Sequence, residues 1–159
     1  MYSSGQGMPQ TQHIWLVAPL FVGAVAQFCS VIIYLLPVRA TINLIRREKS
    51  LGRVGTSWND LRIFTQTVIY ASTAHLVEIG FWAGLFILCG EFRDFGTAFY
   101  HSAVNYTSLG YGDLIMSPKW RLLGPLETAN GMLLFGVSTA MIFAVMLWLI
   151  QSRFADLRD

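Results

Sequence analysis

The sequence predicts an all-α membrane protein with three transmembrane helices, and two observations indicate this fold class. The chain has 159 residues, of which 54% are hydrophobic and only 13% are charged, whereas an ordinary soluble domain carries about a quarter charged residues. Charged side chains are also nearly absent from three long windows, residues 14–36, 63–89 and 123–150, where only Glu78 and Glu127 occur. Each window is long enough to cross a bilayer core of about 30 Å as a helix.

The first transmembrane helix is expected at residues 14–37, after an N-terminal tail, residues 1–13, that is almost without side-chain charge. This tail lacks the basic segment of a cleavable signal peptide, and the apolar run is longer than such a peptide needs. We therefore expect the first window to remain as a transmembrane helix with its tail outside the cell. Pro37 cannot donate a helix hydrogen bond, so it predicts a kink or a stop at the end of this helix.

Basic residues gather in the connection that follows, residues 38–60. The basic side chains in and beside this linker are Arg39, Arg46, Arg47, Lys49, Arg53 and Arg62. The positive-inside rule then predicts a multi-pass protein of the plasma (inner) membrane, with the linker and the short tail, residues 151–159, in the cytoplasm and the N-terminus outside. Val38, Ile42 and Ile45 share one helical face, which favours an amphipathic helix on anionic lipid at the cytoplasmic leaflet. A plain solvated linker is the alternative.

The second and third windows enclose a segment with a different pattern. The second helix is expected to begin at Leu61, and the third near Leu122 with Pro125 in its first turn, where proline is tolerated. Between them, residues 94–107 predict a helix of three to four turns, with Asp94 as its N-cap. A helix of that length is too short to cross a membrane.

The stretch "NYTSLGYGDL", residues 105–114, is the least helical part of this region. Non-helical backbone at membrane depth is tolerated only where it is buried in protein or lines a wet cavity. Converging carbonyl groups suit a monovalent cation that has shed its water, provided that several copies of the chain surround one axis. The glycines permit the backbone angles that this requires. The Ser108 hydroxyl can add an oxygen at the inner mouth, and Asp113 can concentrate cations at the outer mouth. The segment is therefore interpreted as a re-entrant loop in a closed cyclic oligomer.

Two stretches resemble a known family. "TSLGYGD", residues 107–113, resembles the T-x-G-Y-G-D signature of potassium-channel selectivity filters. "GMLLFGVSTA", residues 131–140, is similar to the G-x-x-x-F-G-x-x-T-A pattern in the inner helix of the simplest bacterial two-helix potassium channels. The resemblance implies a pore domain at residues 61–150, with an outer helix, a re-entrant pore helix, a selectivity-filter loop and an inner helix, assembled as a homotetrameric ion-channel pore. The first helix is an addition to that two-helix plan.

The resemblance also implies roles for individual residues. The filter would consist of Thr107, Ser108, Leu109, Gly110, Tyr111 and Gly112, with K⁺ held at Ser108, Leu109, Gly110 and Tyr111. Asp113 would brace the filter at its outer mouth. The positions that match the cavity and the bending points of the inner helix are Gly131, Met132, Phe135, Gly136 and Thr139, and helical periodicity places Phe143 and Leu147 at a hydrophobic gate further along. For Gly131 and Gly136, a bending point and close helix packing are equal alternatives. The family usually has Thr in place of Ser108 and Val or Ile in place of Leu109, whereas Tyr111 keeps the GYG form that favours potassium.

Four polar residues are candidates for modulating the pore: His75, Glu78, His101 and Glu127. The first two lie in the second window, where a charged group costs roughly 2.5–3.5 kcal/mol unless it is paired. Their structural alternative is a polar contact with Gln27 or Ser138, and for the last two it is support of the pore helix. Some family members pair a pore-helix Glu with the filter Asp, but Val104 stands at that place. Hydrogen bonds from His101, Tyr100 or Tyr106 are expected instead.

The sequence as a whole predicts a potassium-selective channel that conducts K⁺ passively through a tetrameric, carbonyl-lined filter. The alternatives are a non-selective monovalent cation channel and a non-conducting accessory channel subunit. No enzymatic activity, no cofactor besides the permeant K⁺ and no nucleic-acid partner are expected. The expected partners are further copies of the chain and membrane lipids.

Overall fold

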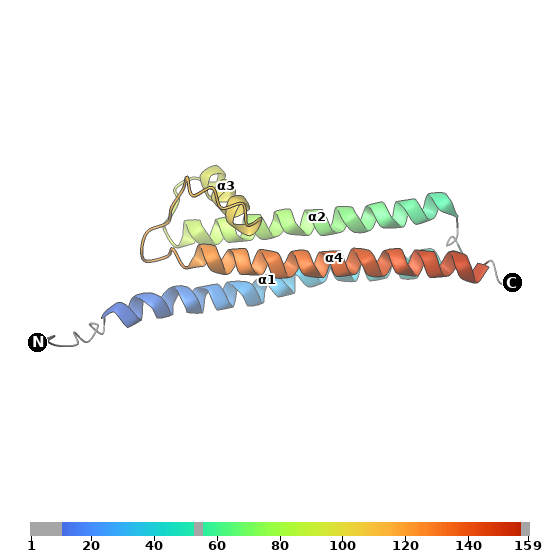
Figure 1. The fold of residues 1–159 in the computed structure, drawn as a ribbon, viewed down its shortest axis with the longest axis horizontal. Helices are drawn as coiled ribbons and strands as arrows, with labels where there is room; N and C mark the ends of the chain where they lie inside the picture. Colours follow the sequence, from blue (N-terminus) through green and yellow to red (C-terminus); the bar gives the residue numbers. More distant parts are fainter. Residues whose placement is uncertain (1–10, 53–55, 157–159) are drawn as a thin grey trace, which may run out of the picture.

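The computed structural model describes residues 11–52 and 56–156, with side chains over residues 17–52 and 56–153. All regular structure in these ranges is helical, which confirms the predicted fold class. The helices are α1 (Thr11–Ser50), α2 (Ser57–Leu88), α3 (Phe95–Tyr106) and α4 (Leu123–Asp156), shown in Figure 1. The predicted tail up to residue 10, Arg53 and residues 157–159 lie outside the described residues.

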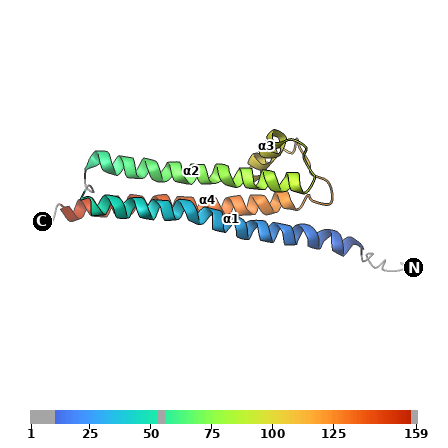
Figure 2. The same ribbon diagram turned by 180° about the vertical axis from the view of Figure 1, so that it is seen from behind.

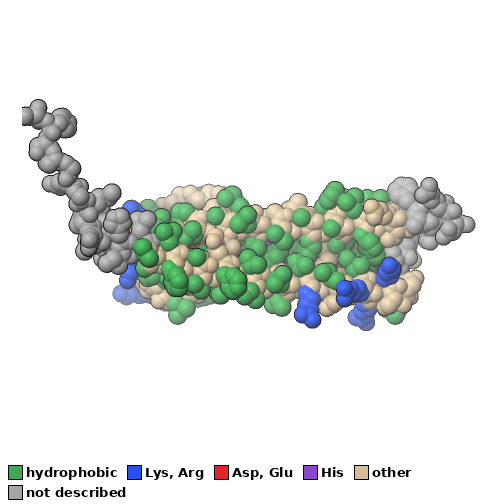
Figure 3. Space-filling view, turned by 90° about the horizontal axis from the view of Figure 1, so that it is seen from below, with side chains coloured by type: hydrophobic (Ala, Val, Ile, Leu, Met, Phe, Trp, Pro, Cys, Tyr) green, Lys and Arg blue, Asp and Glu red, His purple; other side chains and the backbone are tan. Residues whose placement is uncertain are grey.

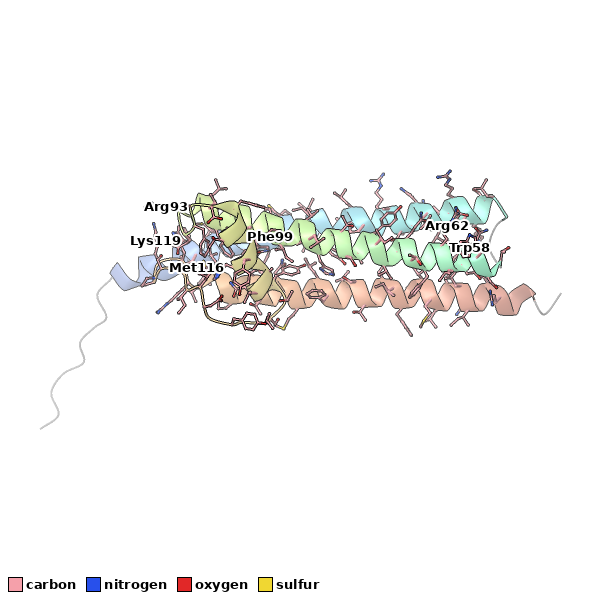
Figure 4. All side chains as sticks on the ribbon, turned by 90° about the horizontal axis from the view of Figure 1, so that it is seen from above. Trp58, Arg62, Arg93, Phe99, Met116 and Lys119 are labelled. Atoms are coloured by element: carbon pink, nitrogen blue, oxygen red, sulfur yellow. The ribbon has the colours of Figure 1, made fainter. Side chains whose placement is uncertain are left out.

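The three long helices lie side by side and give the molecule two distinct ends. The start of α1 and the short α3 lie at one end, and the last turns of α1 and α4 lie at the other (Figures 1 and 2). Figure 4 shows basic and aromatic side chains at both ends, with Arg93 and Lys119 near α3 and with Trp58 and Arg62 at the start of α2. The end that faces the cytoplasm stays a prediction from the basic linker.

Three helices are long and apolar enough to cross a membrane: Val17–Ser50, Ser57–Leu88 and Leu123–Arg153. Hydrophobic side chains cover the middle of the face in Figure 3, and Lys and Arg side chains lie toward its ends. Along α1 the exposed side chains include Phe21 at 69% and Phe28 at 68% of full exposure. A soluble monomer rarely exposes so continuous an apolar surface, whereas lipid tails solvate it well.

The side chains that α1 turns toward the other helices are mostly small or polar, and few are large and apolar. Its buried side chains include Ala26, Ser30, Tyr34, Thr41 and Glu48. Their spacing places them on one side of the helix, where α1 packs on both α2 and α4. Lipid tails are as apolar as leucine, so helices in a membrane associate through close packing of small residues and through hydrogen bonds. The interior of this bundle is accordingly rich in polar side chains.

The linker differs from the prediction, because α1 does not end at Pro37. The helix runs without interruption from Thr11 to Ser50 and contains Pro37 in its interior. Pro37 is buried and lines a cavity together with Ile69 and Tyr70 of α2, and a neighbouring helix can support a proline within a membrane helix. Residues 38–50 are therefore an extension of α1 and not a separate surface helix.

The extension of α1 is joined to α2 by an ion pair. The carboxylate of Glu48, which is buried, lies 2.6 Å from the Arg62 guanidinium. At the same end of the bundle, Arg153 of α4 lies 3.2 Å from the Asp60 carboxylate. Basic residues of this end therefore bind neighbouring helices as well as facing outward.

The short helix α3 begins and ends as predicted within one residue. The Asp94 carboxylate accepts a hydrogen bond from the Thr97 backbone N–H at 2.9 Å. This bond lowers the pKa of Asp94, since it stabilises the charged form. With 12 residues, α3 is about 18 Å long, so it is too short to cross a bilayer. The chain then returns through residues 107–122 to α4, whose first turn contains Pro125.

Candidate ion-conduction site

The loop after α3 has a backbone in which the sign of φ alternates. Ser108, Gly110 and Gly112 have φ values of 62°, 60° and 71°. Leu109 and Tyr111, which lie between them, have negative φ, because Ser108 is the one non-glycine residue with positive φ in the described ranges. Alternating left- and right-handed conformations can turn successive peptide groups to the same side. Such a backbone can present a row of carbonyl oxygens to one ligand.

The glycines adopt positive φ freely, whereas Ser108 is strained there. A serine in this region costs of order 1 kcal/mol or more and persists only where its surroundings hold it. The conformation of the loop is therefore fixed by its neighbours as well as by its own sequence.

The base of the loop is hydrogen-bonded to the last turn of α3. The Ser108 N–H donates to the Asn105 carbonyl at 2.9 Å. The N–H groups of Leu109 and Gly110 both donate to the Val104 carbonyl, at 3.0 and 3.2 Å. These bonds use the free carbonyls at the end of a helix. A displacement of the last turn of α3 would consequently be passed on to the loop.

The outer end of the loop is held by a tyrosine and a glutamate. The Tyr100 hydroxyl donates to the Asp113 carboxylate at 2.8 Å, and this hydrogen bond raises the pKa of Tyr100 because it favours the neutral phenol. The Glu91 carboxylate accepts from the Ser117 N–H at 2.7 Å and from the Ser117 hydroxyl at 2.6 Å. Of the three candidates expected to replace the missing pore-helix Glu, Tyr100 contacts Asp113.

For the channel that the sequence predicts, we expect Tyr100→Phe to shorten the open time several-fold. The change removes the hydrogen bond to Asp113 and keeps the ring, so the outer end of the loop is held by one contact fewer. Single-channel recordings at neutral pH measure the effect. Tyr70→Phe on α2 is the matched control, because Tyr70 takes no part in this contact. Equal open times in both variants would contradict a supporting role for Tyr100.

The inner helix α4 passes very close to the end of α3 at Gly131. A Cβ atom at Gly131 would overlap the Tyr106 carbonyl oxygen and would lie 3.1 Å from the Tyr106 carbonyl carbon. Gly136, by contrast, has no atom within 4 Å of such a Cβ. The geometry thus favours close packing as the reason for glycine at position 131 and gives no packing reason at position 136.

The predicted cavity residues share one exposed side of α4. These exposed residues are Met132, Phe135, Gly136, Thr139, Phe143 and Leu147. Residues 107–113 of the loop are exposed as well, with the Tyr111 side chain at 65% of full exposure. In a single chain the loop and this side of α4 therefore have no covering element among the described residues. The exposed loop and the exposed side of α4 can contact the same surfaces of further copies of the chain around an axis.

Of the predicted modulatory residues on α2, His75 is half-buried and Glu78 is buried. His75 Nε2 lies 2.6 Å from the Ser138 hydroxyl, which was one of its expected partners, and its Nδ1 lies 2.9 Å from the Tyr106 hydroxyl. Glu78 is completely buried, and the side chain that faces its carboxylate is Ser30 of α1. Neither of the two partners expected for Glu78 takes that role.

His101 and Glu127 support α3. The Asn105 side-chain amide donates to His101 Nε2 at 2.9 Å, and the imidazole ring packs between aromatic rings. The buried Glu127 carboxylate accepts a hydrogen bond from Ser102 in the middle of α3. Thr128, one turn into α4, donates to the Asn105 carbonyl at 2.9 Å. These contacts attach the pore helix to α4 along its length.

Sequence reasoning did not identify Tyr34, Ser30 and Glu91. Tyr34 is 3% exposed and its hydroxyl is hydrogen-bonded to Ser138. Its signal in the sequence was its position: a tyrosine with a polar hydroxyl in the interior of an apolar span needs a partner there. Glu91 gave no such signal, since its partner Ser117 is separated from it by the whole of α3 and the loop.

Comparison with known proteins bears on the part of the chain that contains this site. Residues 74–147, slightly less than half of the chain, match the family described as ion channel. The matched stretch contains the second half of α2, α3, the loop and most of α4. No individually curated protein and no solved structure gave a match. The description of this family as ion channel supports a transport protein. Residues 74–147 are therefore similar to the ion-channel family.

Proposed function

We propose that the protein is a potassium-selective channel in which four copies of residues 107–112 form the selectivity filter. The observation that carries this proposal is the alternating φ at Ser108, Gly110 and Gly112 in a loop that contains the GYG sequence. A row of carbonyl oxygens from each copy can replace the water shell of K⁺, and binding at several adjacent sites lets ions displace one another along the pore.

The proposed filter requires several copies of the chain around one axis, because a single chain supplies only one loop. One loop cannot surround an ion, and identical chains that close a ring do so with cyclic symmetry. The exposed loop and the exposed side of α4 are the surfaces available for this contact. In such a ring, Met132, Phe135 and Thr139 line a cavity below the filter. Phe143 and Leu147 lie further along α4 and narrow its cytoplasmic opening.

The orientation of the channel is proposed from its charges. Most of the basic residues lie in the extension of α1, at the start of α2 and at the end of α4, so this end lies in the cytoplasm by the positive-inside rule. Asp113 then lies at the outer mouth of the filter, where its charge attracts cations before they enter.

Reconstitution of the purified full-length protein into planar bilayers tests the proposal. With K⁺ and Na⁺ on opposite sides, the reversal potential is expected to follow K⁺ by about 59 mV for each tenfold change in its gradient. A reversal potential that ignores the identity of the cation would indicate a non-selective channel. Absence of current together with a monomeric protein would instead indicate an accessory subunit.

A further inference from the structure

A chain of hydrogen-bonding side chains crosses the bundle at the level of the base of the loop. We call it the polar column, and it consists of Tyr34 of α1, Ser138 of α4, His75 of α2 and Tyr106 of α3. The Tyr34 hydroxyl contacts the Ser138 hydroxyl. His75 Nε2 lies 2.6 Å from the same hydroxyl, and His75 Nδ1 lies 2.9 Å from the Tyr106 hydroxyl. Each of the four helices thus contributes one member.

The contacts of Ser138 determine the direction of every hydrogen bond in the polar column. The Ser138 hydroxyl donates its one proton to the Leu134 carbonyl at 2.8 Å, so it accepts from its other partners. Tyr34 therefore donates to Ser138, and so does the N–H at Nε2 of His75. Nδ1 of the neutral imidazole is then an acceptor, and it receives the proton of Tyr106. A neutral His75 with its proton on Nε2 satisfies every donor in the polar column.

Three members of the polar column are buried, and the fourth, His75, is half-buried. Tyr34, Ser138 and Tyr106 are 3%, 5% and 0% exposed. The His75 ring stacks on Phe135 with a centroid distance of 4.2 Å, and the Tyr34 and Tyr106 rings lie on its other sides. Hydrogen bonds in such surroundings are stronger than in water, and an unpaired group there is costly. The four side chains therefore hold one another in fixed positions.

Tyr106 connects the polar column to the proposed filter. It is the last residue of α3, and Thr107 follows it directly. Its backbone carbonyl packs against Gly131, while its side chain is held by His75. The two preceding carbonyls, of Val104 and Asn105, accept the N–H groups at the base of the loop. The position of Tyr106 thereby determines where the loop begins.

We infer that His75 is a positioning residue for the filter: through the polar column it holds Tyr106, and through Tyr34 it makes α1 part of the support of the pore. The inference rests on the proposed function, because it concerns how the filter of that channel is held. It gives α1, which the two-helix plan lacks, a role in ion selectivity at a distance from the ion path.

A double-mutant cycle on Tyr34→Phe and Tyr106→Phe tests the inference by the K⁺/Na⁺ permeability ratio. Each change removes one hydroxyl and keeps the ring. Each is expected to lower the ratio by about 2- to 10-fold, the range that corresponds to one hydrogen bond. The double variant is expected to equal Tyr106→Phe within about twofold, because Tyr34 acts on the filter only through Tyr106. Tyr70→Phe, the same change on α2 outside the polar column, is expected to leave the ratio unchanged.

A purely structural role gives a different pattern. Two tyrosines that contribute only to folding would lower thermal stability additively and leave the permeability ratio at its wild-type value. Either an unchanged ratio in both single variants or a double variant whose loss is the product of the single losses would overturn the inference.

Solid-state NMR of the full-length protein in bilayers tests the polar column even if the wild type does not conduct. With ¹⁵N-labelled histidine, the His75 signal is identified by its loss in His75→Gln. At neutral pH it is expected to show a proton on Nε2 and a bare Nδ1 that shifts in Tyr106→Phe. The backbone signals of Ser108 and Gly110 are expected to shift in Tyr34→Phe and not in Tyr70→Phe. A charged imidazole, the opposite tautomer or unshifted loop signals would overturn the inference.

Discussion

Gly131→Ala is expected to abolish selective K⁺ conduction and to destabilise the assembled protein by about 1–3 kcal/mol, the usual cost of overpacking. The added Cβ would overlap the Tyr106 carbonyl oxygen and would lie 3.1 Å from its carbonyl carbon. These are backbone atoms, so they cannot move aside as the end of a flexible side chain can. The end of α3 must then shift away from α4. Because the loop is hydrogen-bonded to that last turn, the filter shifts with it.

The measurement separates close packing from helix bending as the role of this glycine. Under close packing, Gly131→Ala changes the K⁺/Na⁺ permeability ratio, since the filter itself moves. If Gly131 is a bending point, the change alters the open probability and leaves the ratio intact. Gly136→Ala, five residues further along α4, is the control, because no atom lies within 4 Å of its added Cβ. Wild-type selectivity in Gly131→Ala would contradict the observed packing.

The sequence predicts the helices of this protein well because each follows from local chemistry. Three apolar windows are long enough to span a membrane, and Asp94 provides the N-cap at the start of α3. The glycines at positions 110 and 112 indicated a backbone with unusual angles, and both have positive φ. Each of these features depends on residues close together in the chain, so the sequence contains the information directly.

The contacts between helices could not be predicted in the same way. Both sides of a membrane helix are apolar, so its pattern indicates only weakly which face turns inward. Gln27 illustrates this, because it was an expected partner of the polar pair on α2 but donates to the Leu126 carbonyl of α4. Pro37 illustrates the opposite error, because it is a strong local signal for a helix end and yet α1 continues through it to Ser50. The rotation and the contacts of α1 had to come from the structure.

Gly110→Ala is expected to eliminate K⁺ current while leaving the fold and the melting temperature nearly unchanged. Gly110 has a φ of 60° and no atom within 4 Å of an added Cβ, so the change meets no steric obstacle within the chain. Its effect comes from the backbone, because an L-residue in the left-handed region costs roughly 1–2 kcal/mol. That cost is removed if the peptide turns to negative φ, and the alternation that aligns the carbonyls is then lost. In a ring of four chains the change occurs in every copy.

Gly110→Ala is expected to change the current without changing the stability of the protein. Thermal unfolding and the oligomeric state are expected to match the wild type, because Gly110 is exposed and an added Cβ would contact no described residue. Current in bilayers is expected to disappear or to lose its preference for K⁺. Gly84→Ala is the matched control, since Gly84 also has open space around an added Cβ but lies in α2 without positive φ. Selective current in Gly110→Ala would show that the filter does not need positive φ at this residue. The alternating φ at Ser108, Gly110 and Gly112 would then no longer support the proposed function.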